Sequence, residues 1–149
     1  DWGLLEHEPH QGMQKLVRVL NRLVASQPAL HEIDFEPQGF QWIDFRDVEQ
    51  SVIAYLRFAK DRDDFIAAVN NYTPVARHGY RLGVPVPGLY AELLNTDAAE
   101  YGGSGVLNLP QIETEPIEFH GFPQSIALIL PPLGSVWVKH VHDSGASKG

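Results

Sequence analysis

The segment 95–106, NTDAAEYGGSGV, concentrates residue types that can do chemistry: two acids, a tyrosine, a serine and three glycines. Glycine-rich loops beside acids hold phosphates, metal ions or a nucleophilic serine in many enzymes. A nucleophile elbow requires G-x-S-x-G, but Val106 stands where the last glycine belongs. A dinucleotide-binding turn starting at Gly103 fails at Asn108, and no G-K-[ST] phosphate loop is present. The known catalytic and nucleotide-binding motifs are therefore excluded for this segment.

Calcium binding is also disfavoured for the same segment. A calcium loop needs oxygen ligands at alternating positions, and Asn95, Asp97 and Glu100 do not have that spacing. Glycine is the residue that most readily adopts the left-handed backbone conformation, so three glycines in five residues are typical of an irregular turn. We expect 95–106 to be a loop between strands.

Two pairs of histidines have a spacing that could suit metal ligands. His7 and His10 are three residues apart, but Pro9 lies between them and makes a shared helical face doubtful. His140 and His142 would share one face of a strand, which suits a metal pair, yet no third ligand is near in the sequence. We expect surface or half-buried histidines and neither a metal nor a cofactor.

The segment 77–81, RHGYR, sets two cations around a histidine and a tyrosine, an arrangement that can bind an anion or stack on a sugar ring. A hairpin turn centred on Gly79 is the favoured interpretation. Glycosidic chemistry needs two carboxyl groups held rigidly at a set separation, whereas Asp61, Asp63 and Asp64 cluster in a solvated turn. We expect no catalytic residue in this chain.

Composition restricts the partners. The 149 residues carry a net charge of −8, which repels a nucleic-acid backbone, and no basic cluster offsets it. No run approaches the roughly 18 apolar residues that cross a membrane. The sequence has no cysteine, which excludes disulfides and fits a reducing compartment such as the cytoplasm. Its start, Asp1-Trp2-Gly3, lacks an initiator methionine and a signal peptide, so we expect it to derive from a longer protein.

One segment is clearly helical. Between 13 and 24 the apolar residues follow a single stripe, and Pro28 ends the helix. An amphipathic helix of this kind needs an apolar partner surface. The stripe consists of Met13, Leu16, Val17, Leu20, Leu23 and Val24.

From about residue 38 the pattern predicts strands. Short runs rich in β-branched and aromatic residues alternate with turn signals, and no helical segment intervenes. Such a series is typical of an antiparallel sandwich or barrel. The eight runs cover residues 39–45, 51–59, 64–72, 80–86, 88–95, 117–122, 124–132 and 135–141. The run at 51–59 is apolar on both faces and is expected to be central.

Several blocks resemble the C-terminal end of bacterial 1,4-α-glucan (glycogen) branching enzymes, members of the α-amylase-type glycoside hydrolase superfamily. These blocks are PALHEIDFEPQGFQWID, NNYTPVARHGYRLGVPVPGLYAELLNTD, YGGSG and LPPLGSVWV, which occur in the family's order over about residues 2–138. One departure is Val19, where the family usually has aspartate, and this makes an exterior helix position more apolar.

The resemblance implies a mainly β architecture: an antiparallel Greek-key β-sandwich, the α-amylase C-terminal all-β domain, preceded by the last helix of a (β/α)8 barrel. It implies three regions: 1–37 for that helix and its connection, 38–142 for the sandwich, and 143–149 for a flexible tail. The family's catalytic carboxylates lie on barrel strands upstream, and a barrel takes about 250 residues. None matches a residue here, so the chain alone is expected to be inactive.

The resemblance also implies partners and a role. Branching enzymes cleave α-1,4-glucan chains and transfer them to 6-hydroxyls in cytoplasmic glycogen synthesis. We expect this domain to stabilise the barrel and to contact glucan through exposed aromatic rings, with Trp42, Tyr80 and Tyr101 as candidates. The alternative is a free-standing carbohydrate-binding β-sandwich module, which would not need an unpartnered helix.

Overall fold

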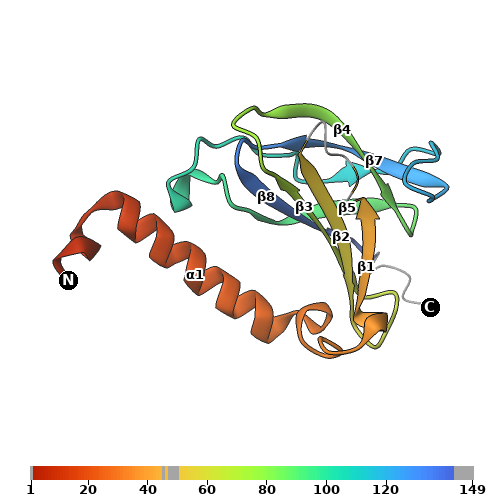
Figure 1. The fold of residues 1–149 in the computed structure, drawn as a ribbon, viewed down its shortest axis with the longest axis horizontal. Helices are drawn as coiled ribbons and strands as arrows, with labels where there is room; N and C mark the ends of the chain where they lie inside the picture. The colour runs from red at the N-terminus through yellow and green to blue at the C-terminus, as the bar shows by residue number, and fades with distance from the viewer. Residues whose placement is uncertain (1, 45, 47–50, 143–149) are drawn as a thin grey trace, which may run out of the picture.

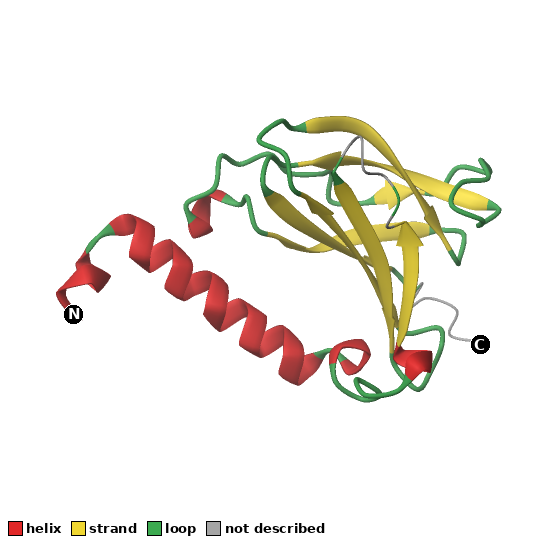
Figure 2. Ribbon diagram, viewed as in Figure 1, coloured by secondary structure: helices red, strands yellow, loops and turns green. Residues whose placement is uncertain are grey.

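The computed structural model describes residues 2–44, 46 and 51–142, and Figure 1 shows a β-sandwich with one long helix along its side. Figure 2 shows that the strands make up the sandwich and that the long helix lies beside it. The helix is α1 (Glu8–Ser26), accompanied by the 3-10 turns η1 (Trp2–Glu6), η2 (Pro28–Leu30), η3 (Pro37–Gly39) and η4 (Ala99–Tyr101). The strands are β1 (Phe40–Asp44), β2 (Val52–Phe58), β3 (Phe65–Asn71), β4 (Arg77–Val84), β5 (Leu89–Asn95), β6 (Ile112–Glu113), β7 (Gln124–Leu130) and β8 (Gly134–His140).

The strands form two antiparallel sheets. One sheet has the order β1-β2-β3-β8-β5-β6, and the other pairs β4 with β7. The chain leaves the larger sheet after β3, and β8 pairs with both β3 and β5. Neighbours in space are therefore far apart in sequence, as in sandwiches whose connections cross between sheets. The prediction of a mainly β, antiparallel sandwich preceded by an amphipathic helix is confirmed.

The core lies between the two sheets. In β2 the residues Val52, Ala54, Leu56 and Phe58 are buried, and the alternate set is half-buried. This period of two places one set in the core and the other on the outer face of the sheet. The strand pairs with β1 on one side and β3 on the other, so its expected interior position is confirmed. The facing core residues on the smaller sheet include Leu82, Val84, Ile126, Leu128 and Leu130.

Helix α1 begins earlier than expected because Pro9 is tolerated in the first turn, where its missing N–H has no helical partner. It ends at Ser26, before Pro28. The helix contacts η4 near its N-terminus and η2 near its C-terminus. Gly12 is buried there, and a Cβ added to it would lie 2.6 Å from the backbone carbonyl of Tyr101. Glycine is therefore required where the helix crosses the loop.

The apolar stripe of α1 is only partly covered by the sandwich. Leu16, Leu20 and Leu23 are half-buried, while Met13, Val17 and Val24 are exposed. The helix thus presents an apolar surface to a partner, as its pattern indicates. Val19 is half-buried rather than exterior, because it lies seven residues after Gly12 and so on the same helix face.

Two local predictions are wrong. The run 117–122 forms a tight hairpin in which Phe119 bridges Phe122, with positive φ at His120 (51°) and Gly121 (79°). Two consecutive positive φ values are the signature of a type I′ turn. The hairpin turn expected at Gly79 is instead an irregularity inside β4, where the register with β7 shifts between Arg77 and Tyr80. The proposed tail, 143–149, lies outside the described residues.

Candidate functional site

The loop 95–106 is organised around one buried acid. The Asp97 carboxylate accepts hydrogen bonds from the Ser104 N–H (2.9 Å), the Ser104 hydroxyl (2.7 Å) and the Val106 N–H (2.8 Å). The Asn95 side chain extends this arrangement, because its oxygen accepts the Asp97 N–H and its amide donates to the Val106 carbonyl. Every oxygen of Asp97 is occupied by the loop itself. The carboxylate thus holds the loop in its conformation.

The pKa of Asp97 reflects this environment. Burial alone would raise the pKa, but the hydrogen bonds from Ser104, Val106 and Gly105 outweigh it and hold the pKa below its ordinary value. Donors aimed at a carboxylate favour its charged form. The hydrogen bonds of the loop are therefore strongest when Asp97 is ionised.

Tyr101 connects this loop to the helix. It is half-buried, and it lines a shallow pocket of about 530 Å³ together with Gly12 and Lys15 of α1. Burial raises the pKa of the Tyr101 hydroxyl, and the neighbouring Glu100 carboxylate raises it further. As a glucan contact this residue remains a hypothesis, and its clear role is in the packing of α1.

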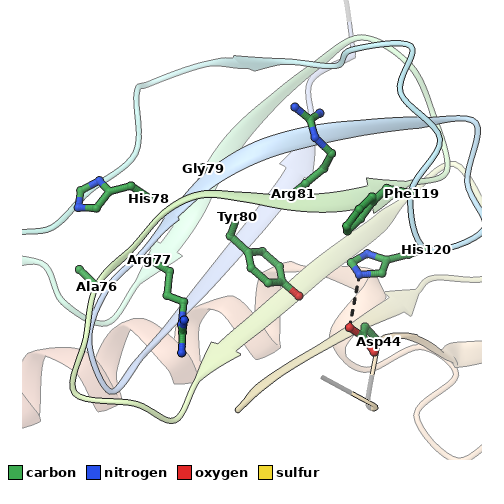
Figure 3. Close-up of a pocket in the computed structure, with 9 residues that line it drawn as sticks. All are labelled: Asp44, Ala76, Arg77, His78, Gly79, Tyr80, Arg81, Phe119 and His120. Carbon is green, nitrogen blue, oxygen red and sulfur yellow. Dashed lines mark ion pairs between the residues drawn. The ribbon is translucent and has the colours of Figure 1, made fainter. Parts of the chain in front are cut away.

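Tyr80 does not meet the condition for stacking on a sugar. Its side chain is only 7% exposed and belongs to the core between the sheets. Figure 3 shows its ring inside a pocket of about 700 Å³, with the His120–Asp44 pair at one side and Arg77 at the other. The distance from His120 Nε2 to Asp44 Oδ2 is 3.4 Å. The expectation of an exposed Tyr80 is corrected, because β4 turns this ring inward.

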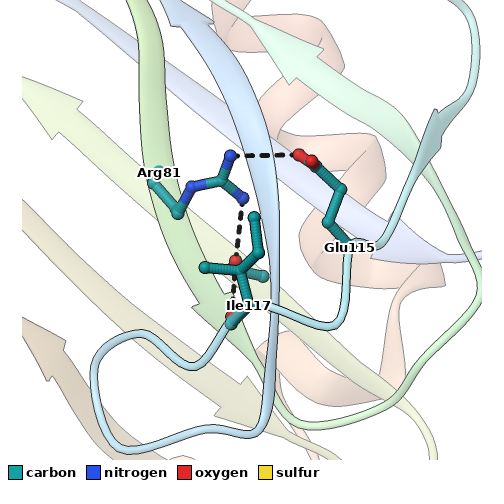
Figure 4. A network of polar contacts seen from close by, with 4 residues as sticks. Arg81, Glu115 and Ile117 are labelled. Carbon is teal, nitrogen blue, oxygen red and sulfur yellow. Dashed lines mark hydrogen bonds and ion pairs between the residues drawn. The ribbon is translucent and has the colours of Figure 1, made fainter.

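Arg81 also lines this pocket, but its guanidinium is held by partners within the fold. Its guanidinium donates to Glu115 Oε1 (3.1 Å) and to the Ser125 hydroxyl (3.0 Å). The Ser125 hydroxyl in turn donates to the Ile117 carbonyl, 2.8 Å away. Figure 4 shows this chain of contacts tying β4 to the segment before β7. Arg81 is therefore occupied in the fold, which removes one of the two cations that the anion-binding interpretation required.

Trp42 is the candidate that the structure places at the surface. It is 48% exposed and lies in a cluster with Phe40 and Tyr55. The Phe40 ring stacks on Tyr55 at 5.3 Å between centroids and meets Trp42 edge-on at 4.9 Å. Sequence reasoning named Trp42 but missed its two companions. The available signals were that Phe40 shares a strand face with Trp42, and that Tyr55 lies in the outward set of β2.

A groove continues from this cluster. The groove has a volume of about 520 Å³, and polar side chains line it beside the Phe40 ring. Arg62 is fixed here, because its guanidinium lies 3.6 Å from the centroid of Phe58 and donates to the Gln38 carbonyl at 2.7 Å. Exposed rings beside fixed hydrogen-bonding groups suit a polyhydroxylated ligand. The lining residues are Pro37, Gln38, Phe40, Gln41 and Arg62.

The histidines show no metal-binding arrangement. The His140 and His142 rings meet edge-on at 4.9 Å between centroids, and His140 Nε2 lies 3.2 Å from the Pro87 carbonyl oxygen. Among residues 2–44, 46 and 51–142, no three His, Asp or Glu side chains gather in a way that suits a metal ion. None of the helices within these ranges is long and apolar enough to span a membrane.

This architecture, two antiparallel sheets packed around one core, is that of a β-sandwich domain. Residues 42–141 match the family described as "Alpha amylase, C-terminal all-beta domain", and the chain belongs to this family.

Its relatives are enzymes named "1,4-alpha-glucan branching enzyme GlgB", which confirms the resemblance in the sequence blocks. The protein of Rubrobacter xylanophilus is 52% identical over 93% of this chain and 19% of its own length. That of Aquifex aeolicus is 49% identical over 94% and 22%, and that of Rhodospirillum rubrum 51% over 91% and 18%. The chain thus spans about a fifth of the length of the curated relatives it matches.

Proposed function

We propose that this chain is the C-terminal domain of a 1,4-α-glucan branching enzyme and takes part in glycogen biosynthesis without doing the chemistry itself. The observation that carries the proposal is the identity of about half over nearly the whole chain with enzymes of that name, in a family of C-terminal domains. The parent enzyme would cleave an α-1,4-glucan chain and transfer it to a 6-hydroxyl. Its catalytic carboxylates would lie in the part of the enzyme that precedes this domain.

The proposed role of the domain is to stabilise the catalytic barrel. The exposed side chains of Met13, Val17 and Val24 supply a contact surface, since each apolar side chain of this size gains about 2 kcal/mol on burial. In this proposal residues 1–37 belong to the barrel side and residues 38–142 form the sandwich. A free-standing carbohydrate-binding module would not need this apolar helix face, which makes that alternative the weaker one.

The test is a graft of this chain onto the Rubrobacter xylanophilus enzyme in place of its matching fifth. We expect the graft to branch amylose, seen as loss of iodine absorbance together with new α-1,6 linkages, and the 149-residue chain alone to be inactive. The Rubrobacter enzyme without its last fifth is the control, and it is expected to lose stability. Branching by the isolated chain would contradict the proposal.

A second part of the proposal is that the domain contacts the glucan through Trp42, Phe40 and Tyr55. A flat ring stacks on the apolar face of glucose, and the groove beside Phe40 offers the Gln38, Gln41 and Arg62 groups for hydroxyls. This places glucan on the outer side of β1 and β2. The cytoplasm, where glycogen is made, is the proposed location, and nucleic acids and membranes are not proposed as partners.

Trp42→Ala is expected to abolish most of the retardation of the isolated chain in a glycogen-containing native gel. The loss of one stacked ring costs about 1 kcal/mol, a factor of roughly five in affinity. Tyr72→Ala, which removes a similarly exposed ring from another part of the surface, is the matched control and should migrate like the parent chain. Equal migration of the parent chain and Trp42→Ala, with or without glycogen, would remove the glucan-contact part while leaving the domain assignment intact.

A further inference from the structure

A second apolar surface lies at one end of the sandwich, away from the Trp42 cluster. Tyr72 and Val75, after β3, are each 61% exposed, and Leu133, before β8, is 70% exposed. We call these three residues the end patch. The two segments that carry them, 71–76 and 131–135, contain no charged residue, although the chain has a net charge of −8. An uncharged, aliphatic-rich surface on an acidic molecule is unusual for solvent-facing loops.

The end patch is built on a buried amide. Asn71 is 2% exposed, and its Nδ2 donates to the carbonyls of Val75 and Pro131, both at 2.9 Å. Its Oδ1 accepts the Thr73 N–H (3.0 Å) and the Thr73 hydroxyl (2.7 Å). The bonds to Val75 and Thr73 hold the segment 71–76 in its own fold, and the bond to Pro131 joins it to the segment 131–135. These hydrogen bonds preorganise the backbone of the end patch.

Leu133 is held outward at a conformational cost. Its φ is +48°, in the left-handed region that a leucine seldom adopts, and its N–H donates to the Thr73 carbonyl at 2.8 Å. Strain of this kind persists where the surrounding structure imposes it, and it concentrates at functional surfaces. A solvent-exposed position with positive φ would be served better by glycine or asparagine. We therefore expect the exposed side chain of Leu133 to contribute to a contact at this surface.

Hydrogen bonds link the segment 131–135 of the end patch to the loop on which helix α1 packs. Thr96 exchanges hydrogen bonds with Ser135, since the Thr96 N–H donates to the Ser135 carbonyl and the Ser135 N–H to the Thr96 hydroxyl. The loop that starts at Thr96 reaches Tyr101, which packs on Gly12. Figure 1 shows the N-terminal half of α1 at this same end of the molecule. The end patch and the N-terminal half of α1 therefore lie at the same end of the domain (Figure 1).

We infer that the end patch is a docking surface for the polypeptide that precedes this domain in the branching enzymes. The inference rests on the proposed function and adds a second contact to the one made by α1. The relatives are about five times as long as this chain, so most of their length lies outside the matched part. A surface of two aliphatic side chains and one tyrosine, without a charged group, has the composition of the centre of a protein–protein interface. Two contacts, one on α1 and one at the sandwich end, would fix the orientation of the domain.

The test compares the isolated chain with the Rubrobacter graft by hydrogen exchange. Amides of 71–76 and 131–135 should exchange about tenfold more slowly in the graft, because a covering surface suppresses local opening. The turn 117–122 is the internal reference, since the pairing of Arg77 with Leu130 and of Val84 with Gln124 puts it at the other end of β4 and β7. Equal exchange in both proteins would overturn the inference even if the graft branches amylose. Protection in an inactive graft would support it while contradicting the proposed function.

A pair of variants gives a second readout. Leu133→Asn should leave the unfolding midpoint of the isolated chain unchanged or higher, because asparagine tolerates positive φ, and should lower the midpoint of the graft. Ile117→Asn, an exposed aliphatic at the far end, should shift both midpoints equally. If the graft does not fold, the same variants are compared for binding to the Rubrobacter enzyme lacking its last fifth, where Leu133→Asn should bind about tenfold more weakly.

Two other occupants of the end patch would overturn the inference. Dimerisation of the isolated chain that Leu133→Asn abolishes, seen by sedimentation, would assign the patch to a second copy. Loss of glycogen retardation in Tyr72→Ala would assign it to glucan.

Discussion

Asp97→Asn should destabilise the domain by about 3 kcal/mol, because an amide cannot replace this carboxylate in either orientation. One carboxylate oxygen accepts the Ser104 N–H, and the other accepts the Ser104 hydroxyl and the Val106 N–H. The amide NH₂ must therefore face one backbone donor whichever way the side chain is turned. Urea unfolding measures the change in the free energy of unfolding. We also expect weaker packing of the loop on α1.

The effect should depend on pH in a defined direction. The pKa of Asp97 is lowered in the folded state, so its contribution is fully present above the unfolded value of about 3.8 and is lost as the pH falls through the folded value. The difference in stability between the parent and Asp97→Asn should thus be constant near neutral pH and shrink below about pH 4.

Asp63→Asn is the matched control for this variant. It makes the same change in charge at an exposed turn position, and it should alter stability by less than about 0.5 kcal/mol. If both variants cost the same, net charge rather than the loop geometry would explain the result.

Much of the sandwich could be predicted from the sequence, because its strands obey a simple rule. The alternation in 51–59 and the apolar runs at 64–72 and 124–132 each correspond to a strand with one face in the core. The short connections then leave antiparallel pairing as the natural arrangement. The hairpin at 117–122 was misread as a strand, since its aromatic residues imitate one. Its positive φ at His120, a residue that is not glycine, leaves no mark in the sequence.

The candidate site was less accessible to sequence reasoning. The sequence motifs predicted a loop at 95–106, but they did not reveal the role of Asp97, because its partners are mainly backbone N–H groups, which every residue except proline possesses. Trp42 and Tyr80 looked equivalent as exposed rings. The structure separates them because Tyr80 lies inward on β4, while Trp42 lies outward on β1 beside Tyr55. Burial of a single ring depends on which strand packs over it.

Gly83→Ala should strongly destabilise the sandwich, because the turn 117–122 packs directly on the backbone of Gly83. An added Cβ at Gly83 would overlap the Phe119 carbonyl oxygen and lie 2.8 Å from its carbon. Both atoms are backbone, so no side-chain rotation relieves the overlap. The Gly83 N–H also donates to His120 Nδ1 at 3.2 Å, and this bond would be lost as the turn moves.

The expected cost of Gly83→Ala is about 3 kcal/mol in urea unfolding, at the upper end of what overpacking produces. Gly79→Ala makes the same change on the same strand, where φ is +68° but nothing lies within 4 Å of the new methyl group. Its cost should be about 1 kcal/mol, from the left-handed backbone alone. The comparison separates the cost of steric overlap from the cost of a left-handed backbone, since Gly83 does not have a positive φ. A larger loss in Gly79→Ala than in Gly83→Ala would mean that the turn 117–122 is not packed on β4 as described.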